Sequence, residues 1–115
     1  MRHNNKGRAF NRPTNQRAAL VRSLARALIL EERISTTEAK AKELRPFIEK
    51  LVSRSKADTV ANRRLVSARL GSPEAVKKLF ATLAPRYEDR TGGYTRIVKR
   101  PATANGRMTA YIAFV

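Results

Sequence analysis

The sequence predicts an α+β protein: a two-layer α/β domain with four helices packed on a small mixed sheet that includes a C-terminal β-hairpin. Apolar residues recur at helical spacing from about residue 14 to residue 85. After Arg86 the pattern changes to β-branched and aromatic residues, which are typical of strands. Residues 1–13 follow neither pattern. They are predicted to form an extended basic arm ahead of a single α/β domain over residues 14–115.

The first helix is predicted to begin at Thr14 or Asn15, because a side-chain oxygen there can accept from the N–H groups of the first turn. Arg22 and Arg26 are four residues apart and form a basic stripe on one face of this helix. The helix should end near residue 31 or 32. Its apolar stripe consists of Leu20, Leu24 and Leu28.

Residues 33–37, Arg-Ile-Ser-Thr-Thr, are predicted to form a small strand or an extended link because the segment is short and rich in β-branched residues. Thr36 or Thr37 then caps a second helix. Pro46 lies inside that helix and should kink it, because proline lacks a backbone N–H and crowds the preceding turn. The core face of this helix is expected to hold Leu44, Phe47 or Ile48, Leu51 and Val52.

Two shorter helices are predicted next. Asp58 is expected to cap the third helix and Gly71 to end it. The fourth helix starts at residues 72–74, Ser-Pro-Glu, which supply a cap, a proline at the first helical position and an acid in the first turn, and Pro85 is expected to stop it. The inward residues are predicted to be Ala61, Leu65 and Ala68 on the third helix and Val76, Leu79, Phe80 and Leu83 on the fourth.

Two strands are predicted at the end of the chain, over residues 94–100 and 109–115, where β-branched and aromatic residues are frequent. Between them, Asn105-Gly106 is a turn signal. The two strands are therefore predicted to pair as a β-hairpin with a loop longer than the tightest kind.

Charge is the feature that most limits the function of this chain. It holds 25 Lys and Arg against nine Asp and Glu, a formal net charge of +16. Residues 1–26 contain no acid at all. Because a compact fold with this charge repels itself, the chain is expected to bind a polyanion, and nucleic acid is the predicted partner.

Other classes of function find little support. The absence of cysteine removes disulfides, thiolate metal sites and cysteine nucleophiles. The single histidine, His3, lies in the arm without an anchoring carboxylate, and no Gly-rich phosphate loop is present. No apolar run approaches the ~18 to 20 residues of a membrane span. We therefore expect a cytoplasmic protein that is not an enzyme and has no cofactor, metal, small-molecule substrate or membrane contact.

The arm is the first candidate contact with nucleic acid. Residues 1–13 are polar, contain Gly7 and Pro13 and show no helical spacing. Its arginines and Lys6 can each meet a different phosphate, because a guanidinium gives bidentate contacts to phosphate oxygens, and its asparagines can bond ribose or bases. The alternatives are a disordered solubilising tail and an organellar transit peptide, although the segment lacks the serine content of the latter.

The second candidate contact is the segment 86–96. Gly92 and Gly93 let the backbone approach a partner closely. Arg90 and Arg96 can bind phosphates, and Tyr94 can stack on a base. The alternative is a loop whose glycines serve turn geometry and whose tyrosine packs at a sheet edge. A weaker candidate, with a solvated surface as its alternative, is the group Arg63, Arg64 and Arg69 on the third helix.

A DNA-binding regulator is the main alternative to an RNA-binding protein, because the third and fourth helices are spaced like a helix-turn-helix. A recognition helix presents polar side chains at its N-terminal end, but residues 73–76 read Pro-Glu-Ala-Val. Charge spread over the arm, the first helix and the hairpin favours an RNA surface. A polybasic membrane-surface protein would need an amphipathic insertion face or a lipidation motif, and neither is evident.

Several short motifs follow one another in a specific order along nearly the whole chain. They are Met1-Arg2-His3, Gly7-Arg8 with Asn11-Arg12, Ile34-Ser35-Thr36-Thr37, Ala-Lys-Ala-Lys-Glu-Leu-Arg from residue 39, Arg63-Arg64-Leu65, Lys78-Leu79-Phe80, Ala84-Pro85-Arg86-Tyr87 and, after Arg90, Gly92-Gly93-Tyr94-Thr95-Arg96-Ile97. In this order they closely resemble the bacterial large-subunit ribosomal protein seventeen family. The chain departs from the family pattern at Phe10, in the 101–107 loop and at Ala113-Phe114.

The resemblance implies a two-layer α/β domain that binds large-subunit ribosomal RNA as a structural component of the ribosome. It also implies neighbouring large-subunit ribosomal proteins as partners and a place near the nascent-peptide exit side. From the residue chemistry and the resemblance together, the expected RNA-binding residues are Arg2, His3, Lys6, Arg8, Asn11, Arg12, Arg17, Arg22, Arg26, Arg63, Arg64, Arg90, Gly92, Gly93, Tyr94, Arg96, Lys99 and Arg100.

Overall fold

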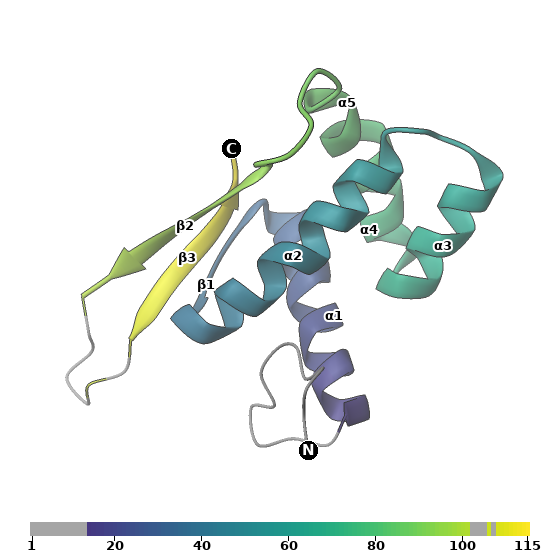
Figure 1. Cartoon of the computed structure of the whole chain (residues 1–115). Helices are drawn as coiled ribbons and strands as arrows, with labels where there is room; N and C mark the ends of the chain where they lie inside the picture. Colours follow the sequence, from purple (N-terminus) through teal and green to yellow (C-terminus); the bar gives the residue numbers. More distant parts are fainter. Residues whose placement is uncertain (1–13, 102–105, 107) are drawn as a thin grey trace, which may run out of the picture.

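A computed structural model describes residues 14–101, 106 and 108–115, so the predicted arm lies outside the described residues. Helices pack beside a small sheet, which confirms the predicted α+β class (Figure 1). In chain order the elements are α1 (Thr14–Glu31), β1 (Arg33–Thr37), α2 (Glu38–Ser55), α3 (Val60–Leu70), α4 (Pro73–Lys78), the π-helical turn η1 (Leu79–Leu83), α5 (Ala84–Arg86), β2 (Thr95–Arg100) and β3 (Thr109–Phe114).

The sheet has the strand order β1-β3-β2 within the described part of the chain, and the predicted β2–β3 hairpin is confirmed. Both strand pairs are antiparallel, so the expectation of a mixed sheet is wrong. The reason is the place of β3. Strands β1 and β2 run in the same direction, as strands joined through helices often do, but β3 inserts between them and no parallel ladder forms.

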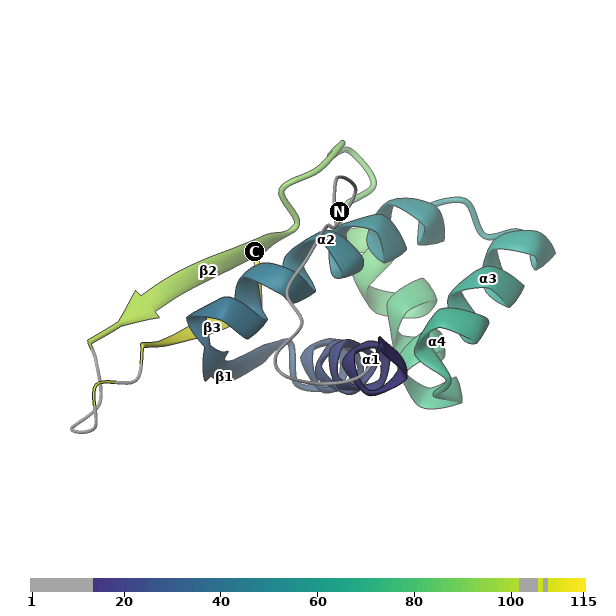
Figure 2. The same ribbon diagram turned by 60° about the horizontal axis from the view of Figure 1, so that its bottom comes forward.

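The strand register divides the sheet into two faces. On one face Ala110 and Ile112 are fully buried, and Ile34 and Ile97 pack against the core beneath the helices. The other face, called the open face below, is covered by no described helix. It consists of Arg33, Ser35, Thr37, Arg96, Val98, Arg100, Thr109, Tyr111 and Ala113. Figure 2 shows the β2–β3 hairpin extending beyond the helices.

The hydrophobic core joins all the longer helices to the sheet. Most of its predicted residues are confirmed: Leu28 of α1 is fully buried and Leu24 packs beside it. On α2 the predicted stripe is buried, and Phe47 packs against it. The predicted residues of the fourth helix are also buried. Together the confirmed positions are Leu44, Ile48, Leu51, Val52, Val76, Leu79, Phe80 and Leu83.

Helix α3 differs from its prediction in two ways. Thr59 caps it by accepting a 3.1 Å hydrogen bond from the Asn62 N–H, so the expectation for Asp58 is wrong by one residue. The predicted inward face is also wrong, because the alanines at positions 61 and 68 are exposed while Val66 and Leu70 are buried. Val66 and Leu70 remove more apolar area from water than the two alanines would, and this difference decides which face of the helix turns inward.

The other helix ends largely follow their local signals. Thr37 caps α2 and Ser72 caps α4, each accepting from the N–H group three residues later. Gly71 ends α3 in the left-handed conformation at a φ of 65°. Pro85 does not stop the fourth helix, which continues to residue 86, because the π-helical turn η1 places this proline at the start of α5. A missing N–H costs little at that position. The kink at Pro46 stays a prediction.

Candidate nucleic-acid interface

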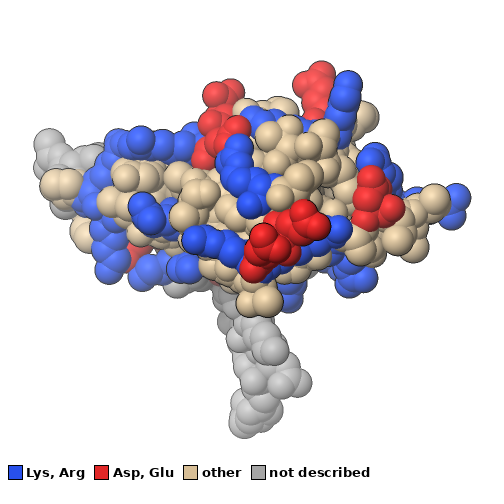
Figure 3. Space-filling model, turned by 90° about the horizontal axis from the view of Figure 1, so that it is seen from above, with Lys and Arg blue, Asp and Glu red and all other residues tan. Residues whose placement is uncertain are grey.

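Basic side chains spread over much of the molecular surface. On the face seen in Figure 3, Lys and Arg are distributed across the protein while Asp and Glu gather in a few clusters. The interactions of the nine acids therefore decide which cations serve the fold and which are available to a partner.

Glu32 joins the end of α1 to the C-terminal helices. Its carboxylate lies 2.7 Å from Arg86 Nη1 and 3.2 Å from Lys78 Nζ. Lys78 also donates a 2.8 Å hydrogen bond to the Leu30 carbonyl near the end of α1. The hydrogen bonds from Arg86 and Lys78 hold the pKa of Glu32 below its ordinary value. Both cations are therefore part of the fold.

Glu38 performs a similar role at the start of α2. Its carboxylate lies 2.8 Å from Lys42 Nζ and 3.3 Å from Lys99 Nζ. These hydrogen bonds lower the pKa of Glu38, with that from Lys42 the stronger influence. Lys99, expected to bind RNA, thus lies on the helix side of β2 and shares a carboxylate, although its side chain stays 64% exposed.

The two predicted arginines of α3 differ in their surroundings. Arg63 donates to both carboxylate oxygens of Asp58, and its guanidinium lies 4.6 Å from the centre of the Phe80 ring. The hydrogen bond from Arg63 lowers the pKa of Asp58. Arg64 is exposed to solvent. Arg64 is therefore better placed than Arg63 to contact a partner.

Helix α1 uses Arg26 to hold the end of α3. The Arg26 Nε donates to the carbonyl of Leu70, where the helix dipole is negative. The Arg26 Nη2 atom lies 2.8 Å from the place where a Cβ on residue 71 would stand, so Gly71 makes room for this contact. The other two predicted arginines of α1, Arg17 and Arg22, are half-buried.

In the segment 86–96, Tyr94 is a core residue. Its side chain is 0% exposed, and its ring centre lies 5.3 Å from that of Tyr87. The Tyr94 hydroxyl donates to the Arg90 carbonyl at 3.3 Å and lies 3.1 Å from the Ser53 hydroxyl. The expectation that Tyr94 stacks on a base is therefore wrong, because no face of the ring reaches the surface. The alternative interpretation, that this tyrosine packs at a sheet edge, is the one that the structure supports, because Tyr94 directly precedes the edge strand β2.

The glycines beside Tyr94 form an exposed turn. Gly93 has a φ of 67°, a left-handed conformation that favours glycine. Arg90 donates a 3.0 Å hydrogen bond to the Gly93 carbonyl, which closes the turn. Arg96 and Arg100 follow on β2, exposed on the open face.

Glu49 anchors this turn to α2, a role that the sequence analysis missed. Its carboxylate accepts hydrogen bonds from the Tyr94 N–H at 3.2 Å and the Thr95 N–H at 3.0 Å. The Thr95 hydroxyl donates a third at 2.8 Å. In the sequence Glu49 belongs to a run of alternating charges that is typical of a solvated helix, so no local signal distinguishes it.

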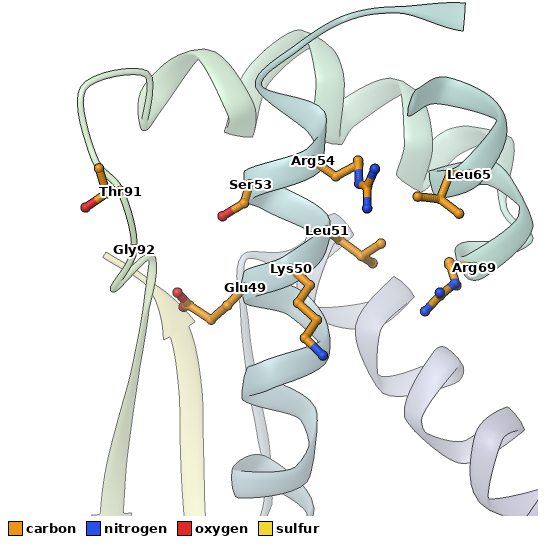
Figure 4. Close-up of a pocket in the computed structure, with 9 residues that line it drawn as sticks. All are labelled: Glu49, Lys50, Leu51, Ser53, Arg54, Leu65, Arg69, Thr91 and Gly92. Carbon is orange, nitrogen blue, oxygen red and sulfur yellow. The ribbon is translucent and has the colours of Figure 1, made fainter. Parts of the chain in front are cut away.

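A groove of about 420 Å³ lies where α2, α3 and the turn at Gly92 meet. Figure 4 shows the Arg54 side chain of α2 and the Arg69 side chain of α3 extending into the space between the two helices, which Leu51 and Leu65 also line. Lys50 adds a third cation to the rim. Arg54 and Lys50 were not predicted as contacts, although their spacing of four residues on an exposed helix face was an available signal.

The described ranges contain no group of three His, Cys, Asp or Glu residues placed to hold a metal ion. None of the helices over these same residues has the length and apolar character needed to span a membrane. The groove itself is lined by three cations, Lys50, Arg54 and Arg69, and by one acid, Glu49, an excess of positive charge that suits a polyanion.

Comparison with known proteins supports the same conclusion. A family model described as Ribosomal protein L17 matches residues 20–115. A protein of Hydrogenobaculum sp. (strain Y04AAS1), named large ribosomal subunit protein bL17, is 52% identical over 117 residues. That alignment covers 100% of this chain and 99% of the relative.

Proposed function

The chain belongs to the ribosomal protein L17 family, and we therefore propose that it is a structural constituent of the large ribosomal subunit that binds large-subunit ribosomal RNA. The observation that carries the proposal is the likeness over the full length to a protein named as a large-subunit component. The net charge of +16 supports an RNA partner, because it requires neutralisation in the compact state. A structural role without catalysis, within the cytoplasmic ribosome and beside neighbouring large-subunit proteins, is part of the proposal.

The proposed RNA contacts lie in three places: the arm of residues 1–13, the helices α1 and α3 with half-buried Arg17 and Arg22 and exposed Arg64, and the region of the glycine turn. In the last of these, Gly92 forms part of the groove wall, and Arg54 and Arg69 lie opposite each other across it. Arg26 and Arg63 are proposed to act mainly within the protein, because their guanidiniums already bond to Leu70 and Asp58. The groove fits RNA because its cations surround a surface that a base or ribose can contact.

Burial in α4 supports RNA binding over the helix-turn-helix alternative. Ala75 is fully buried and Val76 nearly so, and both lie in the first turn of the helix that would read DNA. A recognition helix needs that end exposed to base edges.

Sedimentation of a native lysate through a sucrose gradient, followed by blotting for this protein, tests the proposal. We expect co-migration with the large subunit that survives a high-salt wash, because a constituent held by many phosphate contacts and by neighbouring surfaces is not easily displaced. A chain without residues 1–12 is the matched variant, and we expect it to fold but to enter subunits less efficiently. Recovery of the full chain only in light fractions would contradict the proposal.

A further inference from the structure

The open face of the sheet gathers cations around one aromatic ring. Tyr111 lies in the central strand β3, with Ser35 of β1 and Val98 of β2 paired to it on either side. Arg33 and Arg100 stand two residues further along their strands, in opposite directions, and are paired with Ala113 and Thr109 of β3. Arg96 completes the group on β2. All three arginines are exposed, and Tyr111 is half-buried.

The ring holds two of these guanidiniums in place. The Arg33 Cζ lies 3.8 Å from the centre of the Tyr111 ring, and the Arg100 Cζ lies 5.4 Å from it. The two arginines come from strands on opposite sides of β3, so they approach the ring from two directions. A guanidinium held against a ring keeps its N–H edge available, because the contact uses its planar face. The cluster therefore presents fixed donors to solvent.

The three arginines of the open face are not paired with carboxylates in the described structure, unlike several cations on the helical side. No ion pair found between described residues joins Arg33, Arg96 or Arg100 to an acid, whereas Arg63, Arg86 and three lysines are paired elsewhere. None of the nine positions of the open face is an acid. Like charges gathered without counter-charges repel one another, and an anionic partner removes this cost.

We propose that the open face binds the phosphate backbone of an RNA segment, with Arg33, Arg96 and Arg100 as the contacts and Tyr111 as the residue that positions two of them. The inference rests on the proposed function and adds a surface that lies apart from the groove. Because α2 packs against the other face of the sheet, the groove between α2 and α3 and the open face point in different directions. The protein then holds RNA on two sides.

The composition of the open face favours RNA over a protein partner. Its apolar members are Val98 and Ala113, both half-buried, which provide little of the apolar centre that protein interfaces bury. A sheet face that combines arginines with an aromatic ring is instead typical of RNA-binding sheets. An acidic protein segment is the competing occupant, and the experiment below distinguishes the two.

Site-specific photocrosslinking tests this inference, because the chain contains no cysteine and a single substitution gives a unique attachment point. Ser35→Cys places a benzophenone maleimide on the open face opposite Tyr111, and Ser23→Cys places the same probe on exposed α1. Each full-length variant is assembled into large subunits from rRNA and the remaining proteins, irradiated and analysed for RNA and protein crosslinks. Ser23→Cys is the control that reports on the proposed function alone.

RNA crosslinks from both positions, at different rRNA sites, are the expected result. RNA crosslinks from position 23 together with protein crosslinks, or none, from position 35 would overturn the inference and leave the proposed function intact. If neither variant assembled or crosslinked to RNA while the unsubstituted chain also failed to assemble, the proposed function itself would be wrong and the inference with it.

Discussion

The helical side of the molecule and the open face of the sheet carry the same kinds of cation and use them differently. On the helical side, Arg26 holds the end of α3, Arg63 bonds to Asp58, and Arg86 bonds to Glu32. On the open face, Arg33 and Arg100 contact an aromatic ring and no carboxylate within the described structure. The count of 25 Lys and Arg therefore overstates the number of cations available to RNA, since some of them stabilise the fold.

The two tyrosines of the hairpin region show the same division between residues that stabilise the fold and residues that belong to the open face. Tyr94 is fully buried and bonds through its hydroxyl to the protein, whereas Tyr111 lies half-buried between two guanidiniums. Aromatic residues beside arginines in a sequence do not by themselves reveal which of these roles they have. Substitutions test this division when their effects on the stability of the fold and on the affinity for RNA are measured separately.

The largest expected effect is on Tyr94. We expect Tyr94→Ala to lower the free energy of unfolding by about 3–5 kcal/mol, because it leaves a cavity in the core. Tyr111→Ala should cost only about 1 kcal/mol, the range of strand propensities, and should weaken rRNA binding. Urea denaturation and rRNA binding of the two variants measure both quantities. Equal losses of stability at the two positions would contradict the division.

The next effect concerns the arginines of the helical side. Arg26→Ala removes a charged donor from the Leu70 carbonyl, so we expect a loss of about 2 kcal/mol in stability. The matched control is Arg64→Ala on the exposed side of α3, which should change stability by less than about 0.5 kcal/mol. Thermal unfolding followed by circular dichroism gives both values. A control variant as unstable as Arg26→Ala would show that the contact at Leu70 is not the cause.

A substitution at Gly71 tests the same contact between Arg26 and the end of α3, with a smaller expected effect. Gly71→Ala should cost about 1 kcal/mol, because alanine is strained at the left-handed φ of 65° and its Cβ would displace the Arg26 guanidinium. In the double variant with Arg26→Ala, the combined loss should be smaller than the sum, since the displaced contact is already absent. Strict additivity would show that Gly71 and Arg26 act independently.

The smallest effect is a pH dependence at Glu32. Its pKa is lowered from 4.5 in the folded chain, so the unfolded chain binds a proton more readily. The stabilisation by its two ion pairs is therefore complete above about pH 4.5 and is lost as the pH falls through the lower folded pKa. Glu32→Gln should lose stability at pH 7 and show a flatter profile in this acid range. The control is Glu88→Gln at an exposed position. If the pH profile of stability changed in the same way for this control as for Glu32→Gln, the assignment of the pH dependence to Glu32 would be contradicted.

Features set by a few neighbouring residues were the ones that the sequence predicted well. Thr37, Gly71 and Ser72 cap or end helices through bonds to residues within four positions, and local spacing is sufficient for these. Asp58 and Thr59 are both suitable caps, so the pattern could not choose between them. The α+β class of the fold followed from the change after Arg86, where apolar residues at helical spacing give way to β-branched and aromatic residues typical of strands.

Features that depend on distant residues were missed. Arg33 and Tyr111 are 78 positions apart, and only the insertion of β3 between β1 and β2 brings them together. Glu49 and Tyr94 likewise meet only when α2 packs on the sheet. The sequence analysis assigned the hairpin to RNA binding in general, but it could not find the face of the sheet on which contacts gather, because that face depends on register.

The salt dependence of binding to large-subunit rRNA tests the division of charge most directly. Two double variants each remove two positive charges: Arg33→Gln with Arg100→Gln, and Arg26→Gln with Arg63→Gln. If the open-face arginines meet phosphates, the slope of log affinity against log salt should become shallower by about two for the first variant, at roughly 0.9 per contact by the duplex-DNA coefficient. The slope of the second variant should stay close to that of the unsubstituted chain. Equal changes in both slopes would contradict the account, because binding would then follow total charge alone.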